Sequence, residues 1–343
     1  MQNKIQERIR NIHKNFTIVD AHLDLLYDIE KKRKLGQKRV IETEYLPKFK
    51  DGGINIVVSS IYIDEDFLPE LALRKALDQI SAFYSELDES QDNIIFVKNL
   101  TDLEKALKED KIGILLSFEG VEPLMNDINL LRIFYELGVR GVGLTWSRRN
   151  FAADGCSFSS NKDRENGLSV FGRQIIKEAQ QLGMFIDVSH LNDTGFWDVM
   201  EITKHPVIAS HSNCRSLNGI MRNLTDEQIK AIANTSGVIG INSVSTIVAE
   251  NDADVKTLAD HVDHLRKVAG IEHIGLGFDF CEDIFDDQNL TKSTKRDALY
   301  DVIKGHKYIY QLTEELIKRG YTDDELRLIY GDNFLRLFKS ILI

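Results

Sequence analysis

Short runs of apolar residues recur along the chain, separated by longer stretches with spaced apolar positions. Eight runs have the length and β-branched content of strands that are covered on both faces. They occupy residues 18–25, 54–63, 112–119, 139–146, 184–190, 206–212, 237–244 and 273–280. Helical spacing is found at residues 69–87, 170–182, 193–203, 225–234, 254–269, 297–319 and 323–339. Two of these stretches carry start signals, since Pro69 suits a first helical position and Thr225 opens a capping sequence.

This alternation of strands and helices predicts a (β/α)₈ TIM barrel, with residues 1–343 as a single domain. The same pattern can also build an open, doubly wound sheet, so that alternative stays open. No Gly-rich phosphate loop follows a strand, and Gly275-Leu276-Gly277 lies inside one. Nucleotide binding is therefore not supported.

Composition narrows the class of protein. The formal net charge is −11 over 343 residues, which argues against nucleic acid and anionic membranes as partners. The three cysteines, Cys156, Cys214 and Cys281, are widely spaced and fit a reducing compartment. The N-terminal residues lack an apolar signal region, and no apolar run is long enough to span a bilayer. We expect a cytoplasmic protein.

Candidate metal ligands gather at the carboxyl ends of the predicted strands. His22 and Asp24 lie two positions apart, so in a strand both point to one face. Four other strands end on residues of the same chemical kind: Glu119, His190, His211 and Asp279. In a barrel these ends converge on one face, where active sites lie.

Each residue of this set also has a structural interpretation. A buried histidine can bond a nearby aspartate, Glu119 can cap a helix, and Asp279 can pair with a basic side chain. For the other histidines we keep that interpretation: His13, His205, His261, His264, His273 and His306. Three histidines with several carboxylates exceed one tetrahedral zinc site and suit two ions that share a carboxylate.

The motifs that carry these residues, taken together, resemble the membrane (renal) dipeptidases, peptidase family M19, among the amidohydrolase-like barrels. The matching segments are D-A-H-L-D-L at 20–25, S-F-E-G at 117–120, D-V-S-H at 187–190, P-V-I-A-S-H-S at 206–212, R-N-L-T-D at 222–226, G-L-G-F-D-F at 275–280, A-D-H-V-D-H-L-R-K-V-A-G at 259–270 and G-D-N-F-L-R-L-F at 331–338. They follow the family's order over nearly the whole chain.

The resemblance implies a dinuclear zinc enzyme that hydrolyses dipeptides, and it suggests a homodimer. By position, His22 and Asp24 resemble ligands of the first metal, Glu119 the bridging carboxylate, and His190 and His211 ligands of the second. Asp279 resembles the residue that moves the proton of the metal-bound water. Arg222 resembles the arginine that holds the substrate's C-terminal carboxylate, a task that suits a guanidinium fork.

Two departures from the family pattern bear on the substrate pocket. Better-known members carry a substrate-contacting histidine where this chain has Trp146, and an indole cannot reproduce the donor and acceptor roles of an imidazole. Arg149 and Asn150 are candidates to replace that contact. Many relatives also read D-F-D-G after the catalytic aspartate, whereas this chain reads Asp279-Phe280-Cys281-Glu282. The shape of the pocket should differ accordingly.

We therefore expect a zinc dipeptidase with two Zn²⁺ per subunit, which attacks the peptide bond with a metal-bridging hydroxide and accepts dipeptides with a C-terminal D-residue. One alternative is a dinuclear hydrolase of another small amide, a cyclic amide or a lactone. A second is a catalytically silent metal-binding scaffold.

Overall fold

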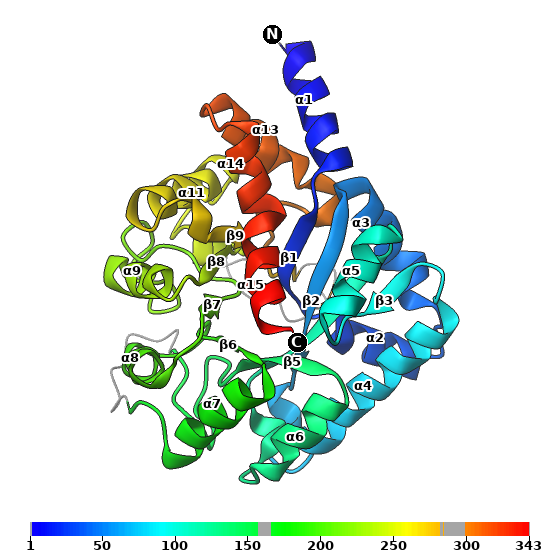
Figure 1. Cartoon of the computed structure of the whole chain (residues 1–343), viewed down its shortest axis with the longest axis vertical. Helices are drawn as coiled ribbons and strands as arrows, with labels where there is room; N and C mark the ends of the chain where they lie inside the picture. The colour runs from blue at the N-terminus through cyan, green and yellow to red at the C-terminus, as the bar shows by residue number, and fades with distance from the viewer. Residues whose placement is uncertain (1, 157–165, 282–283, 285–298, 343) are drawn as a thin grey trace.

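The computed structural model describes residues 2–156, 166–281, 284 and 299–342. Its centre is a closed ring of parallel strands with helices outside it (Figure 1). The ring strands are β1 (Ile18–Leu23), β2 (Ile54–Tyr62), β4 (Ile112–Glu119), β5 (Val139–Gly143), β6 (Phe185–Asp187), β7 (Val207–Ala209), β8 (Val238–Ile241) and β9 (Ile274–Leu276). The ring closes because β2 pairs with β4 while β9 pairs with β1. The predicted (β/α)₈ barrel is confirmed, and the open sheet is wrong.

Each of the eight predicted runs contains one ring strand, but several runs extend beyond it. The run 206–212 holds only Val207–Ala209 as strand, and 273–280 holds only Ile274–Leu276. In both, the chain leaves the sheet before the polar residues that follow. The prediction missed β3 (Ile94–Phe96), which pairs with the first residues of β4 beside the ring. Three residues are too few to show a periodic pattern.

The described helices are α1 (Gln2–Asn15), α2 (Leu25–Lys34), α3 (Leu46–Gly52), α4 (Ala72–Glu89), α5 (Leu100–Lys108), α6 (Asn129–Glu136), α7 (Val170–Leu182), α8 (Asp193–Ile202), α9 (Asp226–Asn234), α10 (Ser245–Val248), α11 (Val255–Val268), α13 (Tyr310–Lys318), α14 (Asp323–Arg327) and α15 (Asn333–Ile341). The helix predicted at 170–182 coincides with α7. Thr225 caps α9 through the expected reciprocal box with Gln228. Pro69 does not begin a helix, because it lies in the turn before α4.

The predicted final helices are shorter or interrupted. The stretch 297–319, whose first two residues lie outside the described part, yields a 3₁₀ turn at His306–Tyr308 and then α13. The stretch 323–339 becomes α14, a π-helical turn at Leu328–Asp332 and α15. Helix α15 crosses in front of the strands in Figure 1. It packs Phe334 and Phe338 among the first residues of the strands, such as Val19 and Val238, and so seals that end of the barrel.

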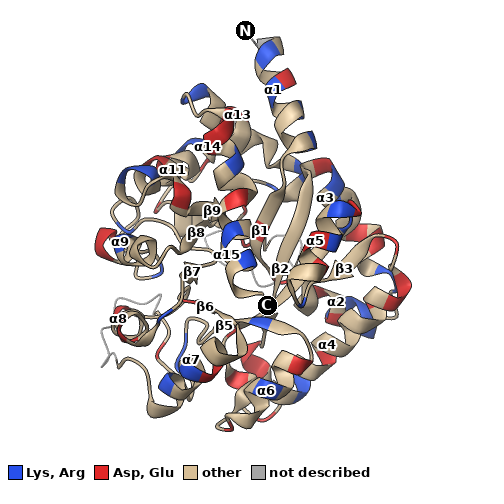
Figure 2. Cartoon of the chain, in the orientation of Figure 1, with Lys and Arg blue, Asp and Glu red and all other residues tan. Residues whose placement is uncertain are grey.

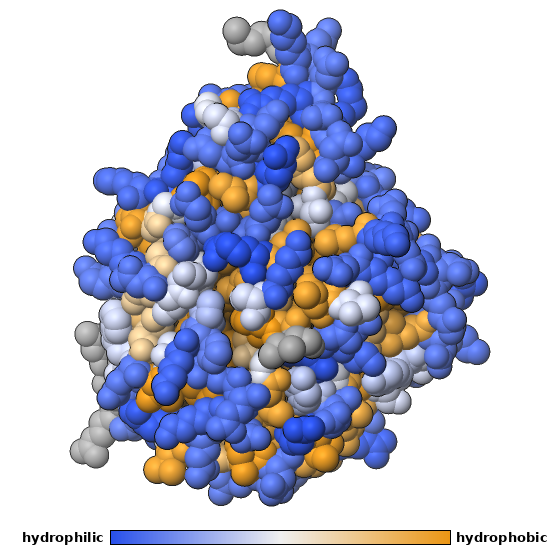
Figure 3. All heavy atoms as spheres, viewed as in Figure 1, coloured by the Kyte–Doolittle hydropathy of each residue, from blue (hydrophilic) through white to orange (hydrophobic). Residues whose placement is uncertain are grey.

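Charge and hydropathy follow the layers. Lys, Arg, Asp and Glu gather on the helices, whereas the strands carry few of them (Figure 2). The face seen in Figure 3 is largely hydrophilic, with apolar side chains showing between the helices. In the residues that the structure describes, no helix has the length and apolar character needed to cross a membrane.

Candidate metal centre

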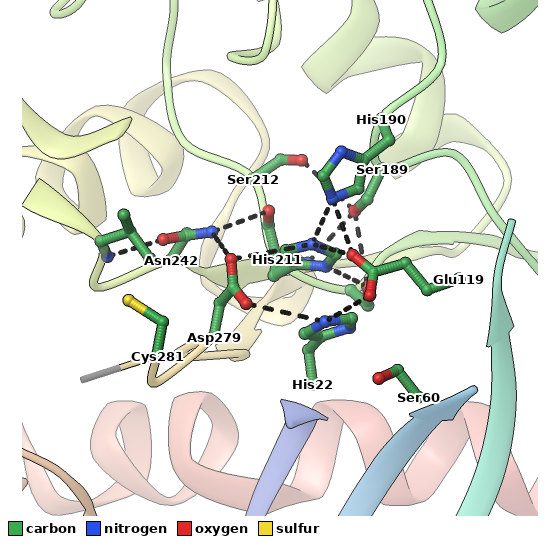
Figure 4. Close-up of polar contacts among 12 residues, drawn as sticks. His22, Ser60, Glu119, Ser189, His190, His211, Ser212, Asn242, Asp279 and Cys281 are labelled. Atoms are coloured by element: carbon green, nitrogen blue, oxygen red, sulfur yellow. Dashed lines mark hydrogen bonds and ion pairs between the residues drawn. The ribbon is translucent and has the colours of Figure 1, made fainter. Parts of the chain in front are cut away.

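The carboxyl ends of five ring strands bring the predicted site residues to one place. His22 belongs to β1 and Glu119 is the last residue of β4, while His190, His211 and Asp279 follow β6, β7 and β9. Figure 4 shows these side chains pointing toward one another from different strands. Four of the five are buried, and Asp279 is the most accessible, with 23% of its side chain exposed. The convergence expected from the barrel is therefore confirmed.

Glu119 lies at the centre of the cluster. Its Oε1 is 3.0 Å from His190 Nε2 and 3.6 Å from His211 Nε2, whereas its Oε2 is 3.6 Å from His22 Nε2. One carboxylate oxygen thus faces a pair of imidazoles and the other faces a third. This is the arrangement that a carboxylate needs to lie between two cations.

A second group of ligand atoms shares His22. Its Nε2 lies 4.0 Å from Asp24 Oδ1 and 3.7 Å from Asp279 Oδ1. The ligand atoms of His22, Asp24 and Asp279 fall within 4.8 Å of one another, as do those of His22, Glu119 and His211. Ser60 donates a hydrogen bond to Asp24 and so orients that carboxylate.

The hydrogen bonds fix which nitrogen of His211 is open to a ligand. Asp187 can only accept, so the hydroxyl proton of Ser210 points to Asp187. Ser210 Oγ must then accept from His211 Nδ1, 2.6 Å away. The lone pair of His211 is therefore on Nε2, which faces His190 Nε2 at 2.9 Å and Glu119. On the other histidine, Ser147 Oγ holds Nδ1 of His190 at 2.8 Å.

The same residues have the donor atoms and the unpartnered polar groups that a bound metal ion requires. Across the described residues, six buried side-chain polar atoms have no hydrogen-bond partner, and two of them are His22 Nε2 and Glu119 Oε2. A buried polar atom without a partner is costly, and these two face each other across the cluster. Imidazole and carboxylate donors suit zinc and related divalent ions. Further, Nε2 of His190 approaches Nε2 of His211 closely, an arrangement that a cation between them would stabilise.

Electrostatics separate the histidines into two kinds. Burial disfavours charge on His22, but Glu119, Asp279 and Asp24 outweigh it and raise its pKa to about 10. Burial, together with Arg222, lowers the pKa of His190 to about 3, and burial with His22 lowers that of His211. Both therefore remain neutral, which is the form that binds metal.

The carboxylates are also perturbed in opposite directions. Although burial acts to raise it, His22 and the other imidazoles hold the pKa of Glu119 well below its usual range. Burial and the charge of Glu119 raise the pKa of Asp279 to about 6 and that of Asp24 well above its usual range. Asn242 donates to Asp279 Oδ2 at 3.0 Å and orients it. A carboxylate with a pKa near neutrality is suited to proton transfer.

The backbone is unusual at two site residues. His190 has φ +68° and Asp279 has φ +58°, the left-handed region that costs a non-glycine residue energy. Such conformations persist only where the surroundings enforce them, and they concentrate at functional sites.

Arg222 lies within the cluster rather than on an exposed loop. It is 4% exposed, and it donates from Nη1 to Ser212 Oγ and from Nη2 to the carbonyl of His211, both at 2.7 Å. Its Nη2 is also 3.2 Å from His190 Nε2. A guanidinium has five N–H groups, so these contacts leave capacity to bind an anion beside the histidines.

Three residues that follow β5 in the chain were predicted to contact the substrate, and the structure places them differently. The Trp146 ring lies 5.9 Å from the ring of His190 and 5.7 Å from that of Tyr62, next to the cluster. Asn150 instead donates to the carbonyl of Leu144 and accepts from two backbone amides of its own loop. Arg149 is exposed and pairs with Asp154. Only Trp146 is thus brought to the site, and Glu282 lies outside the described residues.

Sequence reasoning missed the residues that orient the predicted ligands, namely Ser60, Ser147, Asp187, Ser210 and Asn242. Asn242 follows β8 directly, so its position at a strand end was a usable signal. Asp187 and Ser210 lie within the motifs that contain His190 and His211. Ser60 and Ser147 gave no signal, because serine is common at strand ends for many reasons.

Comparison with known proteins agrees with the geometry. The profile of the membrane dipeptidases, peptidase family M19, matches residues 6–342. An uncharacterized dipeptidase of Schizosaccharomyces pombe is 29% identical, over 98% of this chain and 83% of that protein.

Two solved structures share the fold at lower identity. A metallo peptidase from Rhodobacter sphaeroides, liganded with a phosphinate mimic of L-Ala-D-Ala, superposes with a TM-score of 0.84 at 22% identity, over 95% of this chain and 99% of the other. The probable dipeptidase PvdM from Pseudomonas aeruginosa gives a TM-score of 0.83 at 20% identity, over 100% and 99%. The chain belongs to the membrane dipeptidase family, peptidase family M19, and is an enzyme of that metallopeptidase class.

Proposed function

We propose that this enzyme is a dipeptidase that holds two divalent ions, with zinc as the best match to its donors. The observation that carries the proposal is the position of Glu119 between His22 on one side and His190 with His211 on the other. Asp24 and Asp279 add carboxylates on the His22 side. Ions bound there supply Lewis acidity toward the scissile carbonyl and make water a competent nucleophile near neutral pH.

The chain's own residues would bind and orient the dipeptide. Arg222 presents buried N–H donors beside His190 and His211, which suits the substrate's C-terminal carboxylate. A charged group at this depth favours substrates whose carboxylate lies one residue from the scissile bond, so longer peptides should fit poorly. The phosphinate mimic of L-Ala-D-Ala on the Rhodobacter sphaeroides relative supports tolerance of a C-terminal D-residue.

Asp279 would move the proton. Its carboxylate is held by Asn242 on one oxygen and faces His22 with the other. With a pKa raised to about 6, it can accept a proton from the attacking water and return it to the leaving amine. Its partial exposure leaves it open to the substrate, unlike the deeper ligands.

The decisive experiment is a metal-depletion and reconstitution assay on a library of L,L and L,D dipeptides. We expect the chelated protein to be inactive, two equivalents of Zn²⁺ to restore hydrolysis, and tripeptides or amidated dipeptides to be poor substrates. Full activity of the metal-free protein would overturn the proposal.

Trp146 motivates a second arm of the same assay. Its indole gives the pocket an apolar wall beside His190 where relatives of the better-known type have a histidine. Cyclic amides and lactones lack the free carboxylate that Arg222 would bind. Faster turnover of these compounds than of any dipeptide would favour a different amide or ester as the substrate.

A further inference from the structure

Asp20 and His306 form a buried polar pair that has no part in the proposed mechanism. Asp20 is 0% exposed in β1, His306 is 3% exposed in the turn before α13, and their Oδ2 and Nε2 atoms are 2.6 Å apart. A carboxylate only accepts, so Nε2 of His306 carries a proton and donates it. The pair joins segments 286 residues apart in the sequence.

The other oxygen of Asp20 links the first strand of the barrel to the segment that follows the last strand. Oδ1 accepts from the backbone N–H of Phe278 at 3.0 Å and from that of His22 at 3.4 Å. One carboxylate therefore holds the residue just before the predicted proton carrier Asp279, and it makes a longer contact to the backbone of the predicted metal ligand His22.

His306 contacts the residue on the other side of Asp279. Its ring packs edge-on against Phe280, with centroids 4.8 Å apart, and against Phe49 at 4.9 Å. The backbone of His306 packs closely against α3, since a Cβ on Gly52 would lie only 2.4 Å from the His306 carbonyl oxygen. Both neighbours of Asp279 in the chain are thus held in place, since Phe278 is hydrogen-bonded to Asp20 and Phe280 packs on His306.

These two contacts support the unusual backbone conformation of Asp279. Asp279 adopts φ +58°, and its own N–H reaches the carbonyl of His22 only at 3.4 Å. A left-handed conformation is strained for a non-glycine residue and requires support from its neighbours. The bond of Asp20 to Phe278 at 3.0 Å and the packing of His306 on Phe280 provide that support, which the longer backbone bond of Asp279 does not.

A second buried aspartate makes the same kind of contacts on the other side of the barrel. Asp187 in β6 accepts from the backbone N–H of Ser189 at 3.0 Å and of Ser210 at 2.9 Å, the residues just before His190 and His211. Its second oxygen accepts from the Ser210 hydroxyl. Each pair of neighbouring strands that carries two site residues is therefore tied by one buried aspartate. On the β1–β9 side the aspartate is itself held by His306.

We infer that His306, acting through Asp20, is a positioning residue that holds His22 and Asp279 in their working orientation. Its effect on turnover rests on the proposed dipeptidase activity, while its effect on metal binding rests on the proposed metal site alone. Removing the donor leaves Asp20 with an unpaired buried oxygen, which loosens both strand ends. Partners of this kind typically cost 10- to 100-fold in activity or metal affinity when lost.

The test compares His306→Leu with His306→Gln, whose amide nitrogen can stand in for Nε2. The matched control is His13→Leu. Nδ1 of His13 lies 2.8 Å from the carbonyl oxygen of Gly52, and its Nε2 lies 2.7 Å from the hydroxyl of Thr313. No hydrogen bond joins His13 to Asp20. The readouts are thermal unfolding, Co²⁺ affinity with its visible absorption spectrum, and kcat and KM for a cleaved dipeptide.

We expect His306→Leu to lower kcat about 10- to 100-fold with little change in KM, and to weaken one of two Co²⁺ sites by a similar factor. His306→Gln should recover most of both losses. His13→Leu should lose thermal stability and keep both kcat and the Co²⁺ spectrum. A His306→Leu protein that matches His13→Leu in kcat and in Co²⁺ binding would overturn the inference.

Two further comparisons keep the result decisive. If His306→Leu does not fold, His306→Gln is compared with His306→Asn, whose shorter amide cannot reach Asp20, and equal kcat and Co²⁺ affinity of the two would reject positioning. If the wild-type protein cleaves no dipeptide, the proposed function fails, and the Co²⁺ affinities of the same variants still decide the role of His306.

Discussion

Replacing Asp279 with asparagine tests the proton-transfer step directly. The substitution keeps the size of the side chain and its acceptor for Asn242, since the amide oxygen can take the bond now made by Oδ2 at 3.0 Å. It removes the negative charge and the ability to take up a proton. Loss of a general acid–base group typically costs 10²- to 10⁴-fold in rate, or about 2.7–5.4 kcal/mol in the activation barrier.

The same variant should not lose stability when metal-free. Burial and Glu119 raise the pKa of Asp279 from 3.8 to about 6, so the folded state disfavours the ionised form. The resulting cost is absent below pH 3.8, grows as the pH rises, and is complete above about pH 6. At one unit per 1.36 kcal/mol it reaches at most about 3 kcal/mol, since part of the side chain contacts solvent. Asp279→Asn removes this cost, so the metal-free variant should be at least as stable as the parent at pH 8.

The assay combines steady-state kinetics with zinc analysis and urea unfolding. We expect kcat to fall at least about 100-fold, KM to change little and zinc stoichiometry to stay the same. Asp28→Asn is the control, because Asp28 is a carboxylate more deeply buried than Asp279 whose side chain accepts a hydrogen bond from Tyr45 at 2.6 Å instead of facing the predicted ligands. A variant at position 279 with kcat within about threefold of the parent would refute the assigned role.

Three further expectations test the remaining parts of the structure. Arg222→Lys should raise KM for dipeptides about 10- to 100-fold, because an ammonium cannot make the bidentate bond, while amidated dipeptides are unaffected; an equal effect on both would show a structural role. Trp146→Ala should change the ranking of side chains in a dipeptide library more than kcat on the best substrate, and an unchanged ranking would remove Trp146 from the pocket wall. Glu89, whose pKa Arg33 lowers from 4.5 to about 2 through bonds of 2.8 and 3.0 Å, should contribute about 1 kcal/mol after allowance for solvent screening. Because its folded pKa is lowered, this contribution is present above pH 4.5 and lost as the pH falls toward 2, so Glu89→Gln should destabilise the protein at pH 7 and not near pH 2; equal urea midpoint shifts at both pH values would contradict this.

The sequence determined the barrel because its strands are covered on both faces. Strands buried in this way become continuous apolar runs, and the chain must return outside the sheet between them, so helical patterns alternate with the runs. Among the strands of the described residues, only β3, with three residues beside the ring, was not predicted. The site residues at the strand ends could also be predicted, since each interrupts an apolar run with a metal-binding group. They are His22, Glu119, His190, His211 and Asp279.

Tertiary structure alone decided how these residues face one another. Glu119 presents its two oxygens to different histidines because β4 ends between β2 and β5, a relation that no local spacing encodes. Asn150 satisfies its own loop rather than the pocket, because backbone amides compete for its side chain once the turn forms. The pairing of Asp20 with His306 joins the start of the chain to a segment near its end, and long-range contacts of this kind exist only after the barrel closes. The sequence therefore specifies which chemistry is present, and the closure of the barrel brings those groups together and orients them.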